Sequence, residues 1–214
     1  MTLFKLNKLN KLNKTVGLRQ HPGRPCETVS NRGTTLIEAL LAVGIIAILL
    51  SMALPDLQQL RIRQQGTLAL RKLASSIYLA RSAAAEFRSI AVICPSVDGA
   101  VCGGDWHEGV LVFLDGNDNQ SFDTGDKRVD YLQYEKLPGT LHWRAFRSKP
   151  YLQITPVGFT RYQNGNFTWC DLQKSPENAH QLILSKTGRV RFAKDSNGDG
   201  LRENSSGKPI SCPG

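Results

Sequence analysis

The pattern of hydrophobic and polar positions changes twice along the chain. Residues 34–54 form an apolar run of 21 residues with one charged side chain, Glu38. A helix needs about 20 such residues to cross the apolar core of a bilayer. From 55 to 89 apolar residues recur at roughly helical spacing with arginines and lysines between them, which predicts the amphipathic second half of one long helix. The apolar stripe expected to pack on a sheet is Leu57, Leu60, Leu68, Leu73, Ile77, Ala80, Ala84 and Phe87.

Beyond residue 90 the chain consists of short apolar runs separated by turn residues, a pattern typical of β-strands. The predicted strands are 90–94, 109–115, 128–134, 140–146, 151–155, 167–172, 180–185 and 189–193. The last two flank Lys186-Thr187-Gly188, which predicts a hairpin with Gly188 at positive φ. One long helix followed by many short strands predicts an α+β fold, with the helix packed on an antiparallel β-sheet.

Residues 1–33 read as a basic leader without a globular pattern. Seven basic residues against one acidic residue give this leader most of the chain's net charge of +9. It contains the low-complexity repeat FKLNKLNKLNK, and the apolar run follows it instead of preceding a cleavage site, unlike a secretory signal. Basic residues before an apolar helix predict a cytoplasmic N-terminus, so the bulk of the chain is expected outside the cytoplasm.

Five cysteines are distributed along the chain, and Cys26 lies in the leader. The other four, in a region expected to face an oxidising compartment, allow three pairings. The favoured pairing is Cys94–Cys102 with Cys170–Cys212, because the first closes a short loop and the second holds the C-terminus. Zinc is the rival interpretation, but the sequence has no C-x-x-C pair. We expect structural disulfides and no metal or other cofactor.

Glu38 is costly within an apolar span unless it is paired, so it is a functional candidate. The segment Gly33-Thr34-Thr35-Leu36-Ile37-Glu38 resembles the processing signal of type IV pilins and type II secretion pseudopilins. The resemblance implies that a prepilin peptidase cuts after Gly33, that the new N-terminus at Thr34 is methylated, and that Glu38 pairs with a neighbouring subunit's N-terminal amine. Family members usually begin with Phe or Met, so Thr34 departs from the pattern. Pro55 matches a proline common in the family and is expected to kink the helix.

The charges beyond the helix are segregated. Residues 94–135 hold nine acidic against two basic residues, and residues 144–194 hold nine basic against two acidic residues. Such asymmetry points to an electrostatic partner. On a strand, Arg189 and Arg191 would project from one face while Val190 points to the core, so the two guanidinium groups could contact successive phosphates. Lys186 and Lys194 would extend the same stripe. Solvated arginines on a hairpin are the alternative.

The Gly188-Arg189-Val190-Arg191 sequence resembles a motif near the C-terminus of FimT-type minor pilins, which bind DNA during natural transformation. The soluble region as a whole, including Ala80–Ala85, Cys94-Pro95-Ser96 and 106–113, is similar to the FimT/GspH group, in which FimU-like subunits are also found. Aromatic residues near the bases could stack on exposed nucleobases, although at strand spacing they more often belong to a core. These are Trp143, Phe146, Tyr151, Phe159 and Tyr162.

Two Asp/Asn-rich loops, 115–126 and 195–203, faintly resemble calcium loops. Each lacks one position of the full pattern, and such residues are ordinary in turns. No sequence constellation indicates an enzyme.

The sequence therefore predicts a minor pilin or pseudopilin with four parts: a cleaved cytoplasmic leader (1–33), a transmembrane helix (34–54), its amphipathic continuation (55–89) and a periplasmic β-sheet domain (90–214). The expected partners are other pilin subunits, prepilin peptidase, the inner membrane and DNA bound through its phosphates. A type II secretion pseudopilin or a FimU-like pilus-priming subunit without DNA binding is the alternative.

Overall fold

The computed structural model describes residues 33–135 and 137–213, without the side chains of 52–56. The predicted leader lies outside the described residues except for Gly33. The chain divides into two compact units, 1–47 and 48–214, whose boundary falls within the long helix, and each unit is described by itself. The elements are α1 (Leu36–Phe87), β1 (Ile90–Pro95), β2 (Gly109–Asp115), β3 (Lys127–Gln133), β4 (Gly139–Ala145), η1 (Phe146–Ser148), β5 (Leu152–Ile154), β6 (Gly165–Asp171), η2 (Pro176–Asn178), β7 (His180–Leu184) and β8 (Val190–Phe192).

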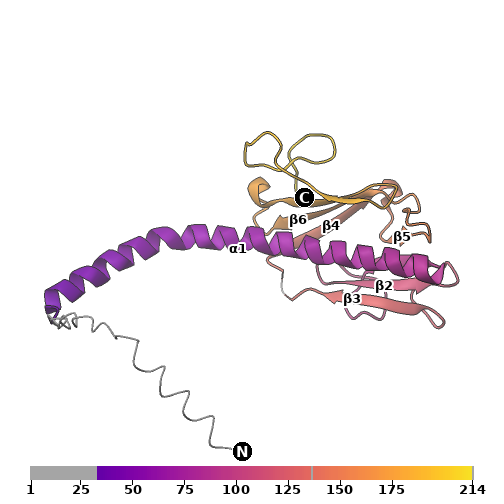
Figure 1. The fold of residues 1–214 in the computed structure, drawn as a ribbon, viewed down its shortest axis with the longest axis horizontal. Helices are drawn as coiled ribbons and strands as arrows, with labels where there is room; N and C mark the ends of the chain where they lie inside the picture. The colour runs from indigo at the N-terminus through magenta and orange to yellow at the C-terminus, as the bar shows by residue number, and fades with distance from the viewer. Residues whose placement is uncertain (1–32, 136, 214) are drawn as a thin grey trace, which may run out of the picture. The chain divides into compact units, whose positions relative to one another are not determined.

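The eight strands form two sheets of four antiparallel strands each, in the orders β3-β2-β1-β5 and β4-β6-β7-β8 (Figure 1). The predicted α+β class and antiparallel strands are confirmed. The expectation of a single sheet is wrong, because β4 pairs with β6 and leaves β5 to pair with β1. That pairing joins residues about 60 positions apart, which local pattern does not specify.

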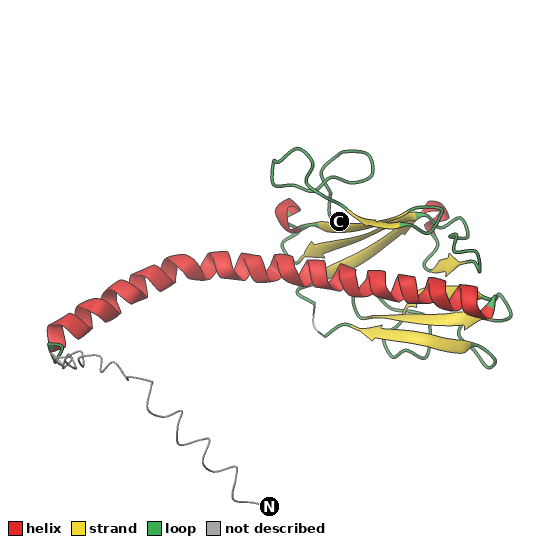
Figure 2. Ribbon diagram, viewed as in Figure 1, coloured by secondary structure: helices red, strands yellow, loops and turns green. Residues whose placement is uncertain are grey.

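The second half of α1 lies across both sheets and closes the main core (Figure 2). Its buried residues follow helical spacing: Ala69, Leu70, Leu73, Ala74, Ile77, Ala80, Ala83 and Ala84. They contact the inner faces of both sheets, where Trp169 and Phe167 are fully buried. The predicted stripe was therefore right only at its centre. Leu57, Leu60, Leu68 and Phe87 are each about half exposed, because the contact surface is the alanine-rich side of the helix, which allows close approach to the sheets.

The first unit contains the start of α1, and its described side chains are exposed. Thr35 caps the helix, since its Oγ1 accepts a hydrogen bond from the backbone N–H of Glu38 (3.3 Å). Glu38 lies in the first turn, where a carboxylate is favoured by the helix dipole. The helical assignment continues through position 55, and the predicted kink at Pro55 stays a prediction.

No helix within the part of the chain that the structure describes combines the length and the apolar character of a membrane span. The membrane-spanning role predicted for residues 34–54 is not confirmed.

Residues 194–213, here called the C-terminal arm, pack on the outer face of the second sheet, the face turned away from α1. Figure 2 shows the arm largely as loop. Ile210 is buried against Ile183 and Ala193 in a separate small cluster. The Cys170–Cys212 disulfide holds the end of the arm to β6, and Cys94–Cys102 closes the loop after β1. Both predicted disulfides are confirmed.

His180 is a buried base on the helix side of β7. It is 6% exposed, its ring lies 5.7 Å from that of Trp169, and its Nε2 has no partner within the described residues. Burial, followed by the positive charge of Arg202, lowers the pKa of His180 to about 4. An unfolded histidine titrates near 6.5. Acid therefore protonates the unfolded chain first, and the stabilisation present above pH 6.5 is lost as the pH falls toward 4.

We expect His180 to make the domain acid-sensitive. Between about pH 7.5 and about pH 5, the free energy of unfolding should fall by about 2 kcal/mol more in the wild-type protein than in His180→Gln. Urea unfolding of both proteins at the two pH values measures this difference. An equal loss in both proteins would show that His180 is not responsible.

Candidate nucleic-acid interface

The β7–β8 hairpin turns through Gly188, as predicted. Gly188 has φ of +71°, its N–H donates to the Ser185 carbonyl (2.9 Å), and the Ser185 N–H donates to the Arg189 carbonyl (3.0 Å). Glycine adopts this left-handed conformation without a steric cost. The turn fixes the start of β8 and thus the direction of the arginines that follow.

Arg189 and Arg191 are both exposed, while Val190 between them packs against the main core. Arg191 is paired with Ile183 of β7, so its side chain shares the outer face of the second sheet. Alternate residues on a strand lie about 7 Å apart. The arrangement of two exposed arginines about a partly buried valine is the one the sequence indicated, and it spaces the two residues along the backbone at about the distance between successive phosphates.

The two predicted lysines differ in their surroundings. Lys186 is exposed in the hairpin turn, and its Nζ lies 5.3 Å from the ring centroid of Tyr162. Lys194 begins the C-terminal arm beside Asp195, which clusters with Asp199 and Glu203 so that their carboxylate oxygens lie within 4.8 Å of one another. The acidic neighbours make Lys194 the less favourable of the two for an anion.

The turn formed by residues 155–160 packs against the β7–β8 hairpin. Lys186 O accepts a hydrogen bond from the N–H of Thr160 (2.9 Å), and Gly188 lies against the Gly158 carbonyl so closely that a Cβ at position 188 would overlap it. The Arg81 guanidinium of α1 donates to the Gly188 carbonyl (2.7 Å). Sequence reasoning missed Arg81, which positions the hairpin from 107 residues away. Gly188 is thus explained by the fold alone.

Gly188→Ala should destabilise the protein by about 3 kcal/mol, because a left-handed non-glycine residue and an overlap with backbone are combined. Gly200→Ala is the matched control, since Gly200 also has positive φ (+86°) but no atom within 4 Å of its Cβ position. We expect it to cost about 1 kcal/mol. Denaturant unfolding measures both variants, and equal losses would contradict the close contact.

The aromatic candidates divide into partly buried and exposed rings. Trp143 stacks on Phe167 with ring centroids 4.2 Å apart, and Tyr151 packs against the smaller core of the first sheet. Phe146, Phe159 and Tyr162 are 57%, 48% and 57% exposed. The Arg147 guanidinium lies 5.8 Å from the Phe146 ring and 5.7 Å from the Tyr162 ring. The three exposed rings are the most accessible to a nucleobase.

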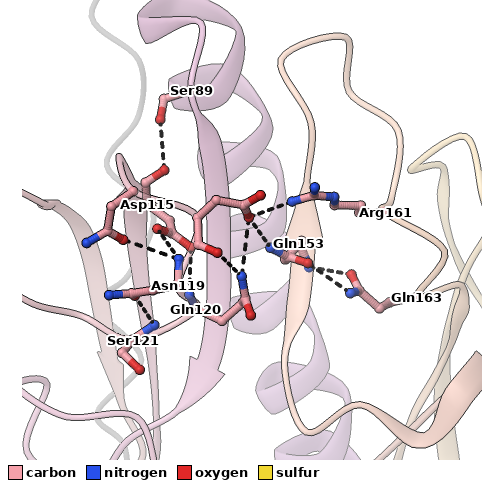
Figure 3. Close-up of polar contacts among 10 residues, drawn as sticks. Ser89, Asp115, Asn119, Gln120, Ser121, Gln153, Arg161 and Gln163 are labelled. Carbon is pink, nitrogen blue, oxygen red and sulfur yellow. Dashed lines mark hydrogen bonds and ion pairs between the residues drawn. The ribbon is translucent and has the colours of Figure 1, made fainter.

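Within the part of the chain that the structure describes, one ion pair joins the acidic and basic segments, and Figure 3 draws it. Arg161 Nη1 lies 2.5 Å from Asp118 Oδ1, and Gln153 Nε2 also donates to that oxygen (3.4 Å). The hydrogen bond from Arg161 is the main reason that the pKa of Asp118 lies below its usual range. Because Arg161 is paired with Asp118, its positive charge is largely offset and adds little to the basic surface around Arg189 and Arg191.

The two loops compared with calcium sites form different clusters. In the first, the side-chain amides of Asn117 and Asn119 donate to Asp123, and Asp115 accepts backbone N–H groups. In the second, the N–H groups of Gly198 and Gly200 donate to Asp195. Exposed acidic clusters such as Asp195, Asp199 and Glu203 are common without an ion. We assign no metal to either loop.

Residues 69–188, more than half of the chain, match the family described as "Type II transport protein GspH". The chain belongs to this GspH family. It is thus a type IV pilin-like protein of the minor pilin and pseudopilin group, as the processing signal and the FimT/GspH-like segments of the soluble region indicated.

Similarity to individual proteins is more limited. Over 99 residues, or 46% of this chain, it is 33% identical to the pilin-like protein PilA1 of Thermus thermophilus, and it spans 58% of that protein's length. Among solved structures, the type IV minor pilin FimU of Pseudomonas aeruginosa is 19% identical with a TM-score of 0.48, covering 69% of this chain and 99% of FimU. The minor pseudopilin EpsH of Vibrio cholerae is 11% identical with a TM-score of 0.44, covering 60% and 95% of the two chains.

Proposed function

We propose that this member of the GspH family is a DNA-contacting minor pilin, made as a precursor and anchored in the inner membrane of a Gram-negative bacterium. Prepilin peptidase removes residues 1–33, and residues 34–54 hold the subunit in the membrane with domain 90–214 in the periplasm. The apolar run of 21 residues with one charge supports the anchor. The basic leader supports the orientation.

In this proposal the subunit enters a filament through its helix. Cleavage after Gly33 creates an amine at Thr34, which is methylated, and Glu38 offsets the corresponding charge of a neighbouring subunit. The half-exposed apolar side chains of α1, among them Leu57, Leu60 and Leu68, support helix-to-helix contact between subunits. Pro55 would loosen the helix beyond the membrane.

Cleavage is tested by co-expressing the full chain with a prepilin peptidase and measuring its intact mass. The expected product lacks residues 1–33 and carries one methyl group at Thr34. Gly33→Leu should keep the precursor mass. A wild-type product that keeps its leader, or is cut elsewhere, would overturn this part of the proposal.

DNA contact rests on one observation, the pair of exposed arginines on a hairpin that is fixed by Arg81 and by the 155–160 turn. Arg189 and Arg191 would each bind a phosphate through their planar guanidinium groups. Lys186 adds charge at the turn, Lys194 adds it where the arm begins, and Gly188 shapes the turn without touching DNA. Contacts of this kind read no sequence, so binding should be non-specific.

The direct test is fluorescence anisotropy of labelled duplex DNA titrated with the full-length protein in non-ionic detergent. Arg189→Ala/Arg191→Ala should weaken binding at least about tenfold. The matched control is Arg71→Ala/Lys72→Ala, which removes two exposed charges from α1 instead. Unchanged binding by the hairpin variant, or equal losses in both variants, would overturn the assignment.

The competing proposal is a type II secretion pseudopilin, or a pilus-priming subunit, without DNA binding. The family match favours the first of these, because its description is of a transport protein. A neighbouring type II secretion operon would favour the pseudopilin, and a cluster of other minor pilin genes would favour the pilus.

A further inference from the structure

Arg191 belongs to a row of side chains that crosses the whole outer face of the second sheet. Arg191 is paired with Ile183, Ile183 with Asn166, and Asn166 with Arg144. Directly opposed residues in antiparallel strands share a face, so Arg144 and Arg191 project to the same side. Three strand spacings separate them, or about 14 Å. That is two steps of the spacing that separates Arg189 from Arg191.

Arg191 and Arg144 line two separate depressions in the protein surface. The first has a volume of about 600 Å³ and is lined by Arg191, Lys194 and Glu203 among others. The second, of about 880 Å³, is lined by Arg144 and Arg147 and, within residues 33–135 and 137–213, by no Asp or Glu side chain. Asn204 and Ser205, at the start of the arm's 204–207 turn, line both. The second depression is therefore the more electropositive, since Glu203 in the first belongs to the acidic cluster.

The floor of the second depression is polar, and one of its hydrogen-bond acceptors lacks a donor among the described residues. Gln181 Nε2 donates to Thr168 Oγ1 (2.9 Å), and Thr168 Oγ1 donates to Asn166 Oδ1 (3.2 Å). Gln181 is only 7% exposed, and its Oε1 is buried without a partner among the described residues. A buried acceptor without a donor is unfavourable, and phosphate oxygens only accept hydrogen bonds, so Gln181 Oε1 suits a water molecule or a nucleobase N–H beside the strand and not the phosphate itself.

We propose that the second depression is a further phosphate site, with Arg144 and Arg147 as its cations. One phosphodiester strand crosses the outer face from Arg191 to Arg144 and passes over the 204–207 turn. This inference rests on the DNA binding proposed above. At the far end the exposed rings of Phe146 and Tyr162 flank Arg147, so bases that are unpaired there can stack on them.

The test compares three double variants of the full-length protein in non-ionic detergent: Arg144→Ala/Arg147→Ala, Arg189→Ala/Arg191→Ala and the control Arg71→Ala/Lys72→Ala. Each is titrated into a labelled thymidine strand of about 12 nucleotides and a duplex of the same length, from about 50 to about 200 mM salt. The Arg144/Arg147 variant should bind about tenfold more weakly than the wild type. The slope of log K against log salt should shrink by about 1.4 on the single strand. Its unfolding midpoint should stay that of the wild type.

A larger loss on the single strand supports an unpaired strand as the ligand, and equal losses on both DNAs support one strand of a duplex. Wild-type affinity and slope in the Arg144/Arg147 variant, with weakened binding in the Arg189/Arg191 variant, would overturn this inference and leave the proposed function standing. Losses no larger than those of the control would also overturn it. Wild-type protein that does not bind either DNA would refute both.

Discussion

Replacing Cys170 and Cys212 together by serine should lower the free energy of unfolding by about 4 kcal/mol. The bridge closes a loop of 42 residues, and in the chain-entropy description a cross-link of that span stabilises by about this amount. It also holds the C-terminal arm on the outer face of the second sheet, where Ile210 is buried. Denaturant unfolding under non-reducing conditions measures the change.

The Cys94–Cys102 bridge provides the control, because it closes only 8 residues. Its double serine variant should lose about 2.5 kcal/mol. The order of the two losses follows from the loop lengths alone. A larger loss for the short loop would contradict the loop-length account of the two bridges.

Trp169→Ala should destabilise the domain by about 3 to 5 kcal/mol, the usual cost of removing a buried indole. Trp169 is fully buried in β6, where its ring lies beside that of His180 on the neighbouring strand and against α1. Gly66 of α1 approaches the indole so closely that any side chain there would overlap it. The cavity left by alanine could not close without moving the helix relative to the sheet.

Two further variants separate cavity formation from other effects. Trp169→Phe should cost much less, because it keeps most of the volume and removes an indole N–H that is buried without a partner in the described residues. Phe192→Ala removes a ring that is 40% exposed and should cost less than Trp169→Ala. Thermal unfolding of the three proteins gives the order. If Trp169→Ala were no worse than Phe192→Ala, the close approach of helix and sheet would be contradicted.

Local pattern predicted the elements well. Each of the eight predicted strands overlaps an observed one, with ends that differ by at most two residues, and α1 ends at Phe87 near the predicted limit. The reason is that alternation and helical spacing are properties of neighbouring residues. The division into two sheets was not predicted, because it depends on the pairing of β1 with β5 across a long segment.

The stripe of α1 illustrates the same limit within one helix. Helical spacing of large apolar residues predicts that Leu68 and Phe87 pack on the sheet, yet both are about half exposed. The contact surface combines Leu70, Leu73 and Ile77 with small residues. These small residues include Ala69, Ala74 and Ala83, because a helix that lies on two sheets must approach both. Helical spacing alone does not say which side of the helix is covered.

At the candidate site, sequence predicted the residues that one hairpin brings together and missed those that tertiary contact adds. Gly188, Arg189 and Arg191 are consecutive or nearly so, and alternation fixes their directions. The contact of Arg81 with the hairpin and the position of Arg144 in the row of Arg191 depend on the assembled fold. The partner of Arg161 is also tertiary, since Asp118 lies 43 positions away.

The salt dependence of DNA binding tests the central claim, contact between the hairpin arginines and phosphates, most directly. For duplex DNA, log K should fall linearly with log salt between about 50 and about 200 mM. In Arg189→Ala/Arg191→Ala the slope should be shallower by about 1.8, which corresponds to two lost phosphate contacts. A slope equal to that of the wild type, or wild-type binding that salt does not affect, would contradict the account.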